Sequence, residues 1–450
     1  MEQRNLARDV AGSVVQAGQI TVHGDFVVSA ERPRTVEAVD AHVGWEDLPE
    51  LPRAVESLVR AQVEMAKELP YRLPGARKPS LATVYVRQDL GAEEQVDTPR
   101  PTPMLDGRSE QIEIPTPVTR LSVRPPTRTV RQTLDRDKHV VVVGGPGQGK
   151  STLSLRLAAD AGERWIGRPA EEPPLVEPVV PLRVSASELA ARLSLPFAES
   201  LAESVRAEYG ALLRTAIHPT DLEHPVAGCR WLLLVDGLDE VADSSDRDRL
   251  VTVLASWATY DGSPYRVVLT SRPIDGTALA PLQRSGAARY ELQPFDDDAL
   301  RAFALNWFEE PETASRFIRQ VEQAHLGELV AVPLLVTIAA IIHTEHGDRP
   351  LPDNQYELYE AYLRYLRTAR GPITTQFDQV REPLLEHLGQ VRIEEDTSLL
   401  TAARTWVAEH LSPTGDWHED LTTFLTAAGP LSHFRHSTDV RFCTTASPNT

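Results

Sequence analysis

Short apolar runs alternate with helical patterns through the middle of the chain. Residues 139–143, 178–184, 231–235 and 266–270 are rich in valine and leucine. Each run predicts a buried strand, since a strand that is covered on both faces does not alternate apolar with polar residues. Helical patterns lie between the runs, and this alternation predicts a parallel α/β sheet.

Other patterns flank the predicted sheet. Residues 51–69 place apolar side chains at helical spacing, which predicts an amphipathic helix. Residues 81–86 are expected to form a strand. Residues from Asp296 onward follow a helical pattern, and the acidic start of this region is typical of a helix N-terminus. The apolar positions of the first helix are Val55, Leu58, Val59 and Val63.

Two segments lack the pattern of a packed domain. Residues 10–24 carry neither formal charge nor proline, and glycine recurs there every six residues between β-branched runs. This composition is typical of segments that stack as strands between chains. Residues 99–126 contain seven prolines, which break regular elements. We therefore expect an exposed linker over residues 99–137 and a partly disordered N-terminal extension.

Composition narrows the classes of function. The chain has 65 Asp and Glu against 46 Lys and Arg, a net charge of −19, which disfavours direct nucleic-acid binding and docking on anionic membranes. The longest apolar run, residues 329–342, contains Pro333 and is shorter than the roughly 20 residues that a membrane helix needs. Two cysteines, Cys229 and Cys443, exclude a disulfide framework and fit a cytoplasmic protein.

A glycine-rich phosphate-binding motif follows the first predicted strand. It fits the pattern G-x-x-x-x-G-K-S/T, with a strand before it and a helix after it. Glycines let backbone N–H groups turn towards a phosphate, and the helix adds its positive N-terminal end. Lys150 is expected to reach the β- and γ-phosphates, and the Ser151 hydroxyl to bind Mg²⁺. The predicted nucleotide-binding residues are Gly144, Gly145, Pro146, Gly147, Gln148, Gly149, Lys150, Ser151 and Thr152.

Acidic residues follow the strand predicted at residues 231–235. Asp236 comes directly after this strand, where its carboxylate is expected to hold Mg²⁺. Asp239 and Glu240 lie one turn further on, and either could orient or deprotonate an attacking water. A solvated acidic loop is the alternative explanation for these residues.

An arginine follows the strand predicted at residues 266–270. Ligands of parallel sheets lie at the carboxyl ends of the strands, so Arg272 is expected to contact the γ-phosphate and to report hydrolysis. A surface arginine at a strand end is the alternative.

Together these segments resemble the NACHT family of STAND-class, signal-transducing P-loop ATPases, in their actinobacterial form. GGPGQGKST, LLLVDGLDEV and VVLTSRP are similar to its Walker A, extended Walker B and sensor segments. The sequences at 178–183, 329–342 and 351–359 resemble the intervening strand and the helical domain that follows the core. The resemblance covers about residues 138–440.

The resemblance implies a switch that uses ATP, ADP and Mg²⁺. The ADP state would be closed, and the ATP state would be open and form homo-oligomers. A proline of the helical domain contacts adenine in the family, and this role maps to Pro333, although Ala331 stands where the family has glycine. The resemblance also implies a winged-helix domain from about residue 356, here expected as a packing module.

The ends of the chain carry two further expectations. Residues 14–18, VVQAG, resemble the receptor-interacting-kinase homotypic motif, so residues 10–24 are expected to template amyloid-like stacking with a partner effector; a disordered tail or a docked hairpin is the alternative. After Phe442 the sequence departs from the family pattern. One deleted base would account for the departure, which predicts a truncated winged helix.

The leading hypothesis is a NACHT-type switch that hydrolyses ATP slowly and relays a signal by oligomerising, with bacterial antiphage defence as the setting. An AAA+-like machine with steady turnover and a non-catalytic interaction protein remain alternatives. The expected domains are a self-stacking motif (residues 1–30), a partly helical region (31–98), a Pro-rich linker (99–137), a nucleotide-binding domain (138–295), a helical domain (296–355) and a winged-helix-like domain (356–450).

Overall fold

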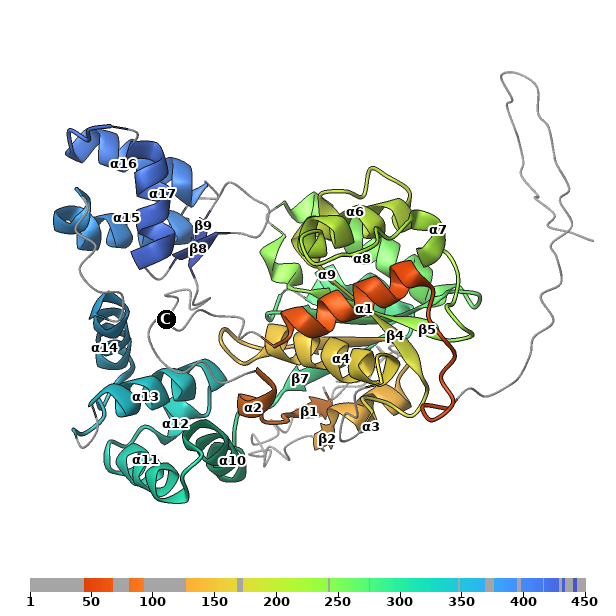
Figure 1. Cartoon of the computed structure of the whole chain (residues 1–450), viewed down its shortest axis with the longest axis horizontal. Helices are drawn as coiled ribbons and strands as arrows, with labels where there is room; N and C mark the ends of the chain where they lie inside the picture. The colour runs from red at the N-terminus through yellow and green to blue at the C-terminus, as the bar shows by residue number, and fades with distance from the viewer. Residues whose placement is uncertain are drawn as a thin grey trace, which may run out of the picture. The chain divides into compact units, whose positions relative to one another are not determined.

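The computed structural model contains an α/β sheet with helices on both faces, followed by further helices (Figure 1). The predicted stacking motif at residues 10–24, residues 99–126 of the Pro-rich segment and the tail after Phe442 lie outside the part of the chain that the structure describes. The described residues are 44–67, 81–92, 127–167, 173–241, 243–274, 276–346, 349–368, 376–394, 398–415, 417–428, 431–433 and 440–442.

The sheet has seven strands in the order β2-β1-β7-β3-β6-β5-β4. The four predicted buried strands are confirmed, and each pairs in parallel with its neighbours. A further parallel strand, β7 (Ala288–Leu292), pairs with β3 and was not predicted, because its sequence ARYEL is short and mixed in polarity. The predicted strands are β3 (Val140–Val143), β4 (Val179–Ser185), β5 (Arg230–Asp236) and β6 (Tyr265–Ser271).

Elements that precede residue 138 extend this sheet. Strand β1 (Asp89–Ala92) pairs antiparallel with β7, and β2 (Thr127–Thr129) pairs antiparallel with β1. Thr129 caps helix α3 (Val130–Arg136) with a capping box. The expected linker over residues 99–137 therefore ends in regular structure that belongs to the sheet.

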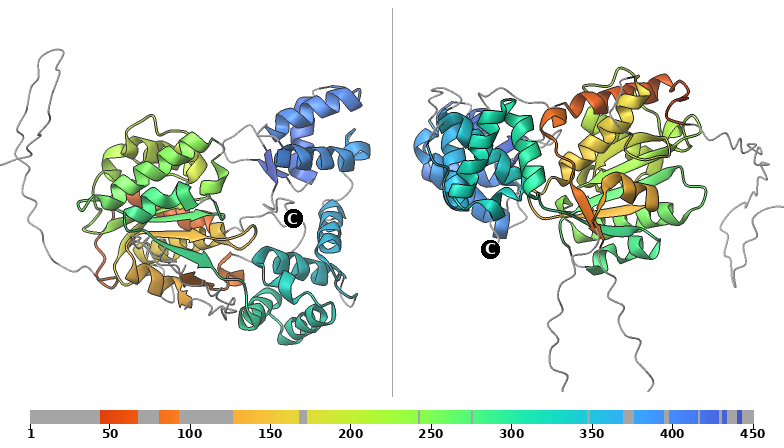
Figure 2. Two further views of the ribbon diagram at one scale, coloured as in Figure 1. Left: turned by 180° about the vertical axis from the view of Figure 1, so that it is seen from behind. Right: turned by 90° about the horizontal axis from the view of Figure 1, so that it is seen from below.

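The predicted amphipathic helix is confirmed as α1 (Arg53–Met65), with Val55, Leu58, Val59 and Val63 all buried. It lies along α4 (Lys150–Trp165), as Figure 2 shows. The two helices approach closely at Gly162, where a Cβ would come within 2.7 Å of the Val63 side chain. This close packing makes α1 part of the core around the sheet.

The strand expected at residues 81–86 is wrong. Residues Leu81–Val84 form a helical turn, α2, and Tyr85 N–H donates to the Leu81 carbonyl at 2.9 Å. Leu81 is buried in the core around the sheet, and Val84 is buried in the core of the helices that follow the sheet. Packing of these two side chains thus outweighs the β-propensity of the LATVYV sequence.

Alternate residues of the strands enter two apolar cores. Val141 and Leu233 belong to one core, whereas Val142 and Leu234 belong to the other. Helices α3 and α4 contribute to the second core, and α4 also packs against the first. The remaining elements around the sheet are α5 (Ala186–Ala190), α6 (Phe197–Tyr209), α7 (Pro219–Leu222), the 3₁₀ turn η1 (Leu238–Glu240), α8 (Ser244–Thr259) and α9 (Gly276–Arg284).

A helical cluster with its own core follows the sheet. As the acidic pattern predicted, Asp296 caps the first helix by accepting from the Ala299 N–H at 2.8 Å. Leu358, Tyr362 and Tyr365 belong to this core, so the cluster continues past residue 355. Its helices are α10 (Asp297–Phe308), α11 (Pro311–Gln323), α12 (Gly327–Val330), α13 (Pro333–His346) and α14 (Gln355–Thr368).

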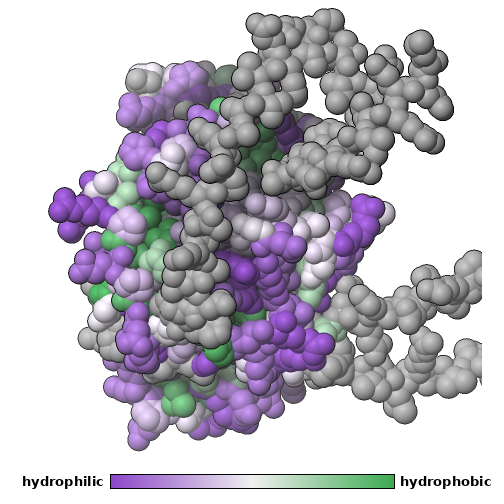
Figure 3. Space-filling view, turned by 90° about the vertical axis from the view of Figure 1, so that its right-hand side faces the viewer, coloured by the Kyte–Doolittle hydropathy of each residue, from purple (hydrophilic) through white to green (hydrophobic). Residues whose placement is uncertain are grey.

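The C-terminal elements form another cluster, whose core runs from Phe377 to Leu425. None of the helices within the described residues is long and apolar enough to cross a membrane. The face in Figure 3 is mostly hydrophilic where it is coloured, in keeping with the high charge of the chain. The C-terminal elements are η2 (Asp378–Val380), α15 (Arg381–Glu394), α16 (Leu399–His410), α17 (Trp417–Ala428) and a hairpin of β8 (Leu431–His433) and β9 (Val440–Phe442).

Candidate nucleotide-binding site

The strand order brings the predicted motifs to one edge of the sheet. Strand β6 lies between β3, which leads into the glycine-rich loop, and β5, which ends at Asp236. The loop joins β6 directly, because Gly144 N–H donates to the Ser271 carbonyl at 3.0 Å. The carboxyl ends of these three parallel strands therefore place the loop, Asp236 and Arg272 beside one another.

The loop depends on glycine for its backbone conformation. Gly147 has φ +71° and Gly149 has φ +93°, in the left-handed region that residues with a Cβ rarely adopt. Gly149 is also the N-cap of α4, so the positive end of a 16-residue helix opens onto the loop. Pro146 is exposed in the turn, and Thr152 is half-buried in the first turn of α4.

The Lys150 side chain extends over the loop. Its ammonium donates to the carbonyls of Gly144 and Gly145, at 2.7 and 3.0 Å. Gln148 stays within the loop, where its side-chain oxygen accepts from the Gly145 N–H at 2.5 Å. Burial lowers the pKa of Lys150, and nearby Arg272 lowers it further against the opposing effect of carboxylates. A partly desolvated ammonium interacts more strongly with an anionic oxygen than an exposed one does.

Asp236 lies at the centre of a polar network. One carboxylate oxygen accepts from the Thr270 hydroxyl at 2.6 Å, and the Ser151 hydroxyl also hydrogen-bonds to this carboxylate. Burial by itself would raise the pKa of Asp236, but Arg183 and the two hydroxyls outweigh it and keep that pKa below its usual value. The carboxylate is therefore ionised, as a metal ligand must be.

The predicted metal ligands fit Mg²⁺. The hydrogen bond between Ser151 and Asp236 brings a hydroxyl and a carboxylate oxygen together, and oxygen ligands are those that Mg²⁺ prefers. Within the described residues no group of three or more His, Cys, Asp or Glu side chains could hold a metal ion. Phosphate and water oxygens would have to complete the coordination, which is how Mg²⁺ is bound at phosphate sites.

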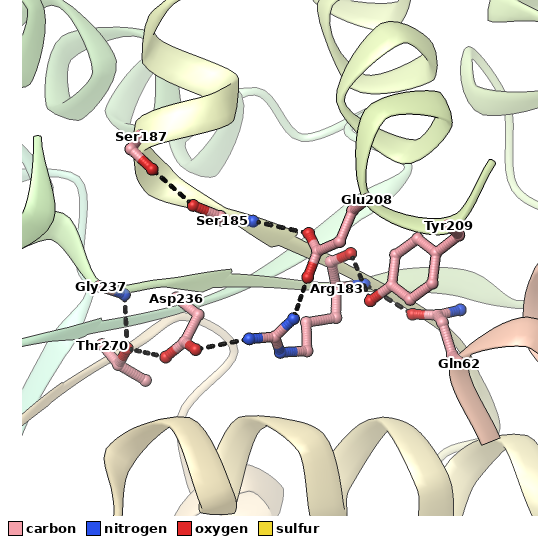
Figure 4. Close-up of polar contacts among 9 residues, drawn as sticks. All are labelled: Gln62, Arg183, Ser185, Ser187, Glu208, Tyr209, Asp236, Gly237 and Thr270. Atoms are coloured by element: carbon pink, nitrogen blue, oxygen red, sulfur yellow. Dashed lines mark hydrogen bonds and ion pairs between the residues drawn. The ribbon is translucent and has the colours of Figure 1, made fainter. Parts of the chain in front are cut away.

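Arg183 on β4 is a site residue that the sequence did not identify (Figure 4). Its guanidinium lies 2.6 Å from the second Asp236 oxygen and also pairs with Glu208 on α6. Burial would lower the pKa of Arg183, but the two carboxylates hold that pKa well above its usual value. The available sequence signal was a single charged residue inside an otherwise apolar strand.

Gln62 on α1 completes the support of β4. Its side-chain nitrogen donates to the Pro181 carbonyl at 2.9 Å, and its oxygen accepts from the Arg183 N–H at 2.8 Å. At the same free edge of β4, the Tyr209 hydroxyl donates to the Arg183 carbonyl at 3.2 Å. The backbone that carries Arg183 is therefore fixed from two helices.

Of the three candidate catalytic residues, Asp239 and Arg272 contact each other, and Glu240 follows Asp239 in the chain. Asp239 accepts from the Arg272 N–H at 2.9 Å and pairs with the Arg272 Nε at 2.9 Å. Glu240 follows in η1 and is half-buried. Its side chain lies near Gly237, which has φ +78° and whose N–H donates to the Thr270 hydroxyl at 2.9 Å.

The start of α13 contacts the glycine-rich loop. Leu334 N–H donates to the Gly147 carbonyl at 3.2 Å, and a Cβ at Gly147 would come within 2.9 Å of the Leu334 side chain. Pro333 lies beside Gly149, 3.9 Å from the position that a Cβ would take there. The structure therefore places Pro333, predicted from the helical part of the chain, next to the phosphate-binding loop.

Comparisons with known proteins identify the class of this region. Residues 138–311 match the NACHT domain family. Among solved structures, the chain is similar to a point mutant of RuvB from Thermotoga maritima, with 14% identity, coverage of 69% of this chain and 88% of that chain, and a TM-score of 0.26. It is also similar to ORC1 from Aeropyrum pernix, solved in complex with DNA, with 13% identity, coverage of 68% and 83%, and a TM-score of 0.29.

Both structural similarities are low over the length of the chain. No match was found among curated proteins. The family match, the P-loop between β3 and α4 and the position of Asp236 at the end of β5 are mutually consistent. Residues 138–311 of this chain are a NACHT domain, a module of the P-loop NTPase class.

Proposed function

We propose that the chain is a NACHT-type switch that binds ATP or ADP together with Mg²⁺ and hydrolyses ATP slowly. The observation that carries this proposal is the position of the buried Asp236 carboxylate, which the Thr270 hydroxyl holds at 2.6 Å at the end of β5, beside Ser151 of the P-loop. It unites the two predicted metal ligands from segments that are far apart in sequence. A loop with only a structural role would not require a buried, ionised carboxylate at this point.

Each polar group at the edge of the sheet has a distinct role in this proposal. Lys150 and the N–H groups at the start of α4 bind the β- and γ-phosphates. Mg²⁺, held by Ser151 and Asp236, would neutralise the charge that develops on the phosphate oxygens. Arg272 lies at the end of the neighbouring strand, where it contacts the γ-phosphate and responds to its loss.

We assign the orientation of the attacking water to Glu240. Both carboxylate oxygens of Asp239 already accept from Arg272, one from its backbone and one from its side chain. Asp239 therefore positions Arg272. Glu240 lies close enough to Lys150 to raise the pKa of that lysine, which places the Glu240 carboxylate near the proposed phosphate position, where it would accept a proton from water.

The contact between α13 and the P-loop provides the coupling that a switch needs. Leu334 bonds to the Gly147 carbonyl and packs over the same residue. Any change in the loop on nucleotide exchange thus acts on the first turn of α13. An equilibrium between two arrangements of this contact would link nucleotide state to the helical cluster.

The wider function extends these contacts to the whole chain. In our proposal, α15 to α17 and the β8–β9 hairpin act as a winged-helix-like packing module, and the ATP state forms homo-oligomers in the cytoplasm. Oligomers would bring copies of residues 10–24 together and allow them to recruit a partner effector. Bacterial antiphage defence is the setting that we propose.

Hydrogen exchange of the full chain with ATP, ADP and no nucleotide tests the proposed switch. We expect ATP and ADP to give different protection at the amides of residues 334–336, while amides in the interior of β5 stay unchanged. Identical exchange in the three conditions, despite demonstrated nucleotide binding, would contradict a switch. Steady turnover without a lasting ATP state would instead favour the AAA+-like machine.

A further inference from the structure

Arg183 places a positive charge on the carboxylate that is proposed to bind Mg²⁺. Its guanidinium lies 2.6 Å from Asp236, and the two side chains are 10% and 6% exposed. Two cations that share one buried carboxylate repel each other, because little water is present to screen them. Binding of Mg²⁺ at Asp236 and Ser151 therefore requires that the charge of Arg183 be balanced elsewhere.

Glu208 on α6 is positioned to balance that charge. Its carboxylate pairs with the other terminal nitrogen of Arg183, and only 9% of its side chain is exposed. The Ser185 N–H donates to the second Glu208 oxygen at 3.1 Å, so this carboxylate is anchored independently of Arg183. As Figure 4 shows, Arg183 lies between the two carboxylates and contacts both.

We propose that Arg183 is a positioning residue. It holds Asp236 in the metal-free state, and it pairs with Glu208 alone when Mg²⁺ binds. The Arg183–Glu208 pair then sets the Mg²⁺ affinity of the site. This inference rests on the proposed nucleotide-binding function. It also implies that movement of α6 changes the Mg²⁺ affinity, because a shift of Glu208 alters how strongly Arg183 competes with Mg²⁺ for Asp236.

The test is a Mg²⁺ titration of fluorescent ADP binding to the full chain. In Glu208→Gln, Asp236 is the only carboxylate left to pair with Arg183. We therefore expect the midpoint, the Mg²⁺ concentration that gives half of the Mg²⁺-dependent change in ADP binding, to rise roughly tenfold. The double variant Arg183→Met with Glu208→Gln removes the competing cation together with the charge of Glu208, and Asp236 is left with Mg²⁺ as its counter-ion. Its midpoint is expected to fall below that of the wild type.

Binding in EDTA separates this role from a merely structural one. Glu208→Gln adds net positive charge near the phosphates, so ADP affinity without Mg²⁺ should be equal or higher. A distorted site would instead bind ADP more weakly with and without Mg²⁺. The matched control is Arg266→Met with Glu177→Gln, which removes an arginine–carboxylate pair at the other end of the sheet. This control should leave the midpoint unchanged.

Three results would overturn the inference. A rise of the midpoint in the double variant would mean that Arg183 orients Asp236 for the metal instead of competing with it. Unchanged midpoints in both Glu208 variants would mean that the pair does not act on the metal site. Wild-type protein that binds no nucleotide at any Mg²⁺ concentration would overturn the proposed function as well, whereas the first two results leave that function intact.

Discussion

The Arg272 side chain lies against the carboxylate of Asp239, with its Nε 2.9 Å from Oδ2, while the Arg272 backbone N–H donates to Oδ1 at 2.9 Å. These contacts tie the end of β6 to the turn after β5. The proposed sensor arginine is thereby joined to an acidic residue of the proposed Walker B segment. The neighbouring carboxylate, Glu240, is the residue that we propose for water activation.

Substitution of the two acidic residues should separate their roles. Glu240→Gln is expected to lower the rate of ATP hydrolysis by roughly 100-fold or more, because general-base contributions are of this size. Asp239→Asn should cost only about tenfold, through misplacement of Arg272. Single-turnover hydrolysis at saturating ATP measures both. A larger loss in Asp239→Asn than in Glu240→Gln would assign the base to Asp239.

Lys150 should be essential for nucleotide affinity. Lys150→Ala removes a charge-assisted contact to phosphate, so we expect ATP and ADP to bind roughly 10- to 100-fold more weakly. Calorimetric titration with ATP, ADP and GTP gives the affinities and the base preference. Lys138→Ala is the control, since Lys138 precedes β3 at the opposite end of that strand. Equal affinity of wild type and Lys150→Ala would rule out the proposed phosphate contact.

Gly147 should matter both for the loop and for its contact with α13. Alanine there must adopt a left-handed backbone, at a cost of about 1–2 kcal/mol, and its Cβ would press against Leu334. Gly286→Ala is a matched control, because Gly286 has φ +89° but no atom within 4 Å of its Cβ position.

Urea unfolding and ADP binding distinguish the two glycine variants. The free energy of unfolding should fall by a similar amount in both variants, because alanine must adopt a left-handed backbone in each. Gly147→Ala should also lose ADP affinity. Wild-type ADP affinity in Gly147→Ala would show that the loop tolerates the contact and would argue against coupling through Leu334.

His139 predicts a pH dependence of stability. It is buried and accepts from the Val267 N–H through Nδ1 at 3.2 Å. Burial, together with Lys138, Arg266 and Arg230, lowers the pKa of His139 to about 4. The folded protein therefore binds this proton less readily than the unfolded chain, and stability is lost as the pH falls from about 6.5 towards 4.

His139→Asn keeps an acceptor for Val267 and removes the titration. The free energy of unfolding, measured in urea between pH 7 and pH 4.5, should fall less steeply in this variant than in the wild type. Parallel curves for the two proteins would mean that His139 does not contribute to the acid sensitivity.

The N-terminal motif should assemble by itself. Residues 1–30 fused to a fluorescent reporter are expected to form thioflavin-positive foci, because an uncharged β-rich segment can stack in register. Val15→Asp places like charges in successive layers of the stack and should disperse the foci. Diffuse fluorescence of the unmodified fusion would exclude templating by this segment.

The sequence by itself indicated the candidate site residues and determined the main strands of the core. A P-loop motif has fixed spacing, and buried parallel strands form continuous apolar runs, so Lys150, Asp236 and the strands β3 to β6 are visible locally. The capped start of α10 at Asp296 and the buried face of α1 were equally readable, because capping and helical periodicity are local properties.

Only the tertiary structure decided the relationships among these parts. The pairing of Arg183 with Asp236 and Glu208 joins β4, β5 and α6, and no local pattern encodes which charged side chain in a buried strand meets which carboxylate. The helical turn at Leu81, the antiparallel strand β1 and the contact of Leu334 with Gly147 likewise depend on packing between distant segments. Propensity and spacing act over a few residues, whereas these contacts form only when the complete sheet brings their partners together.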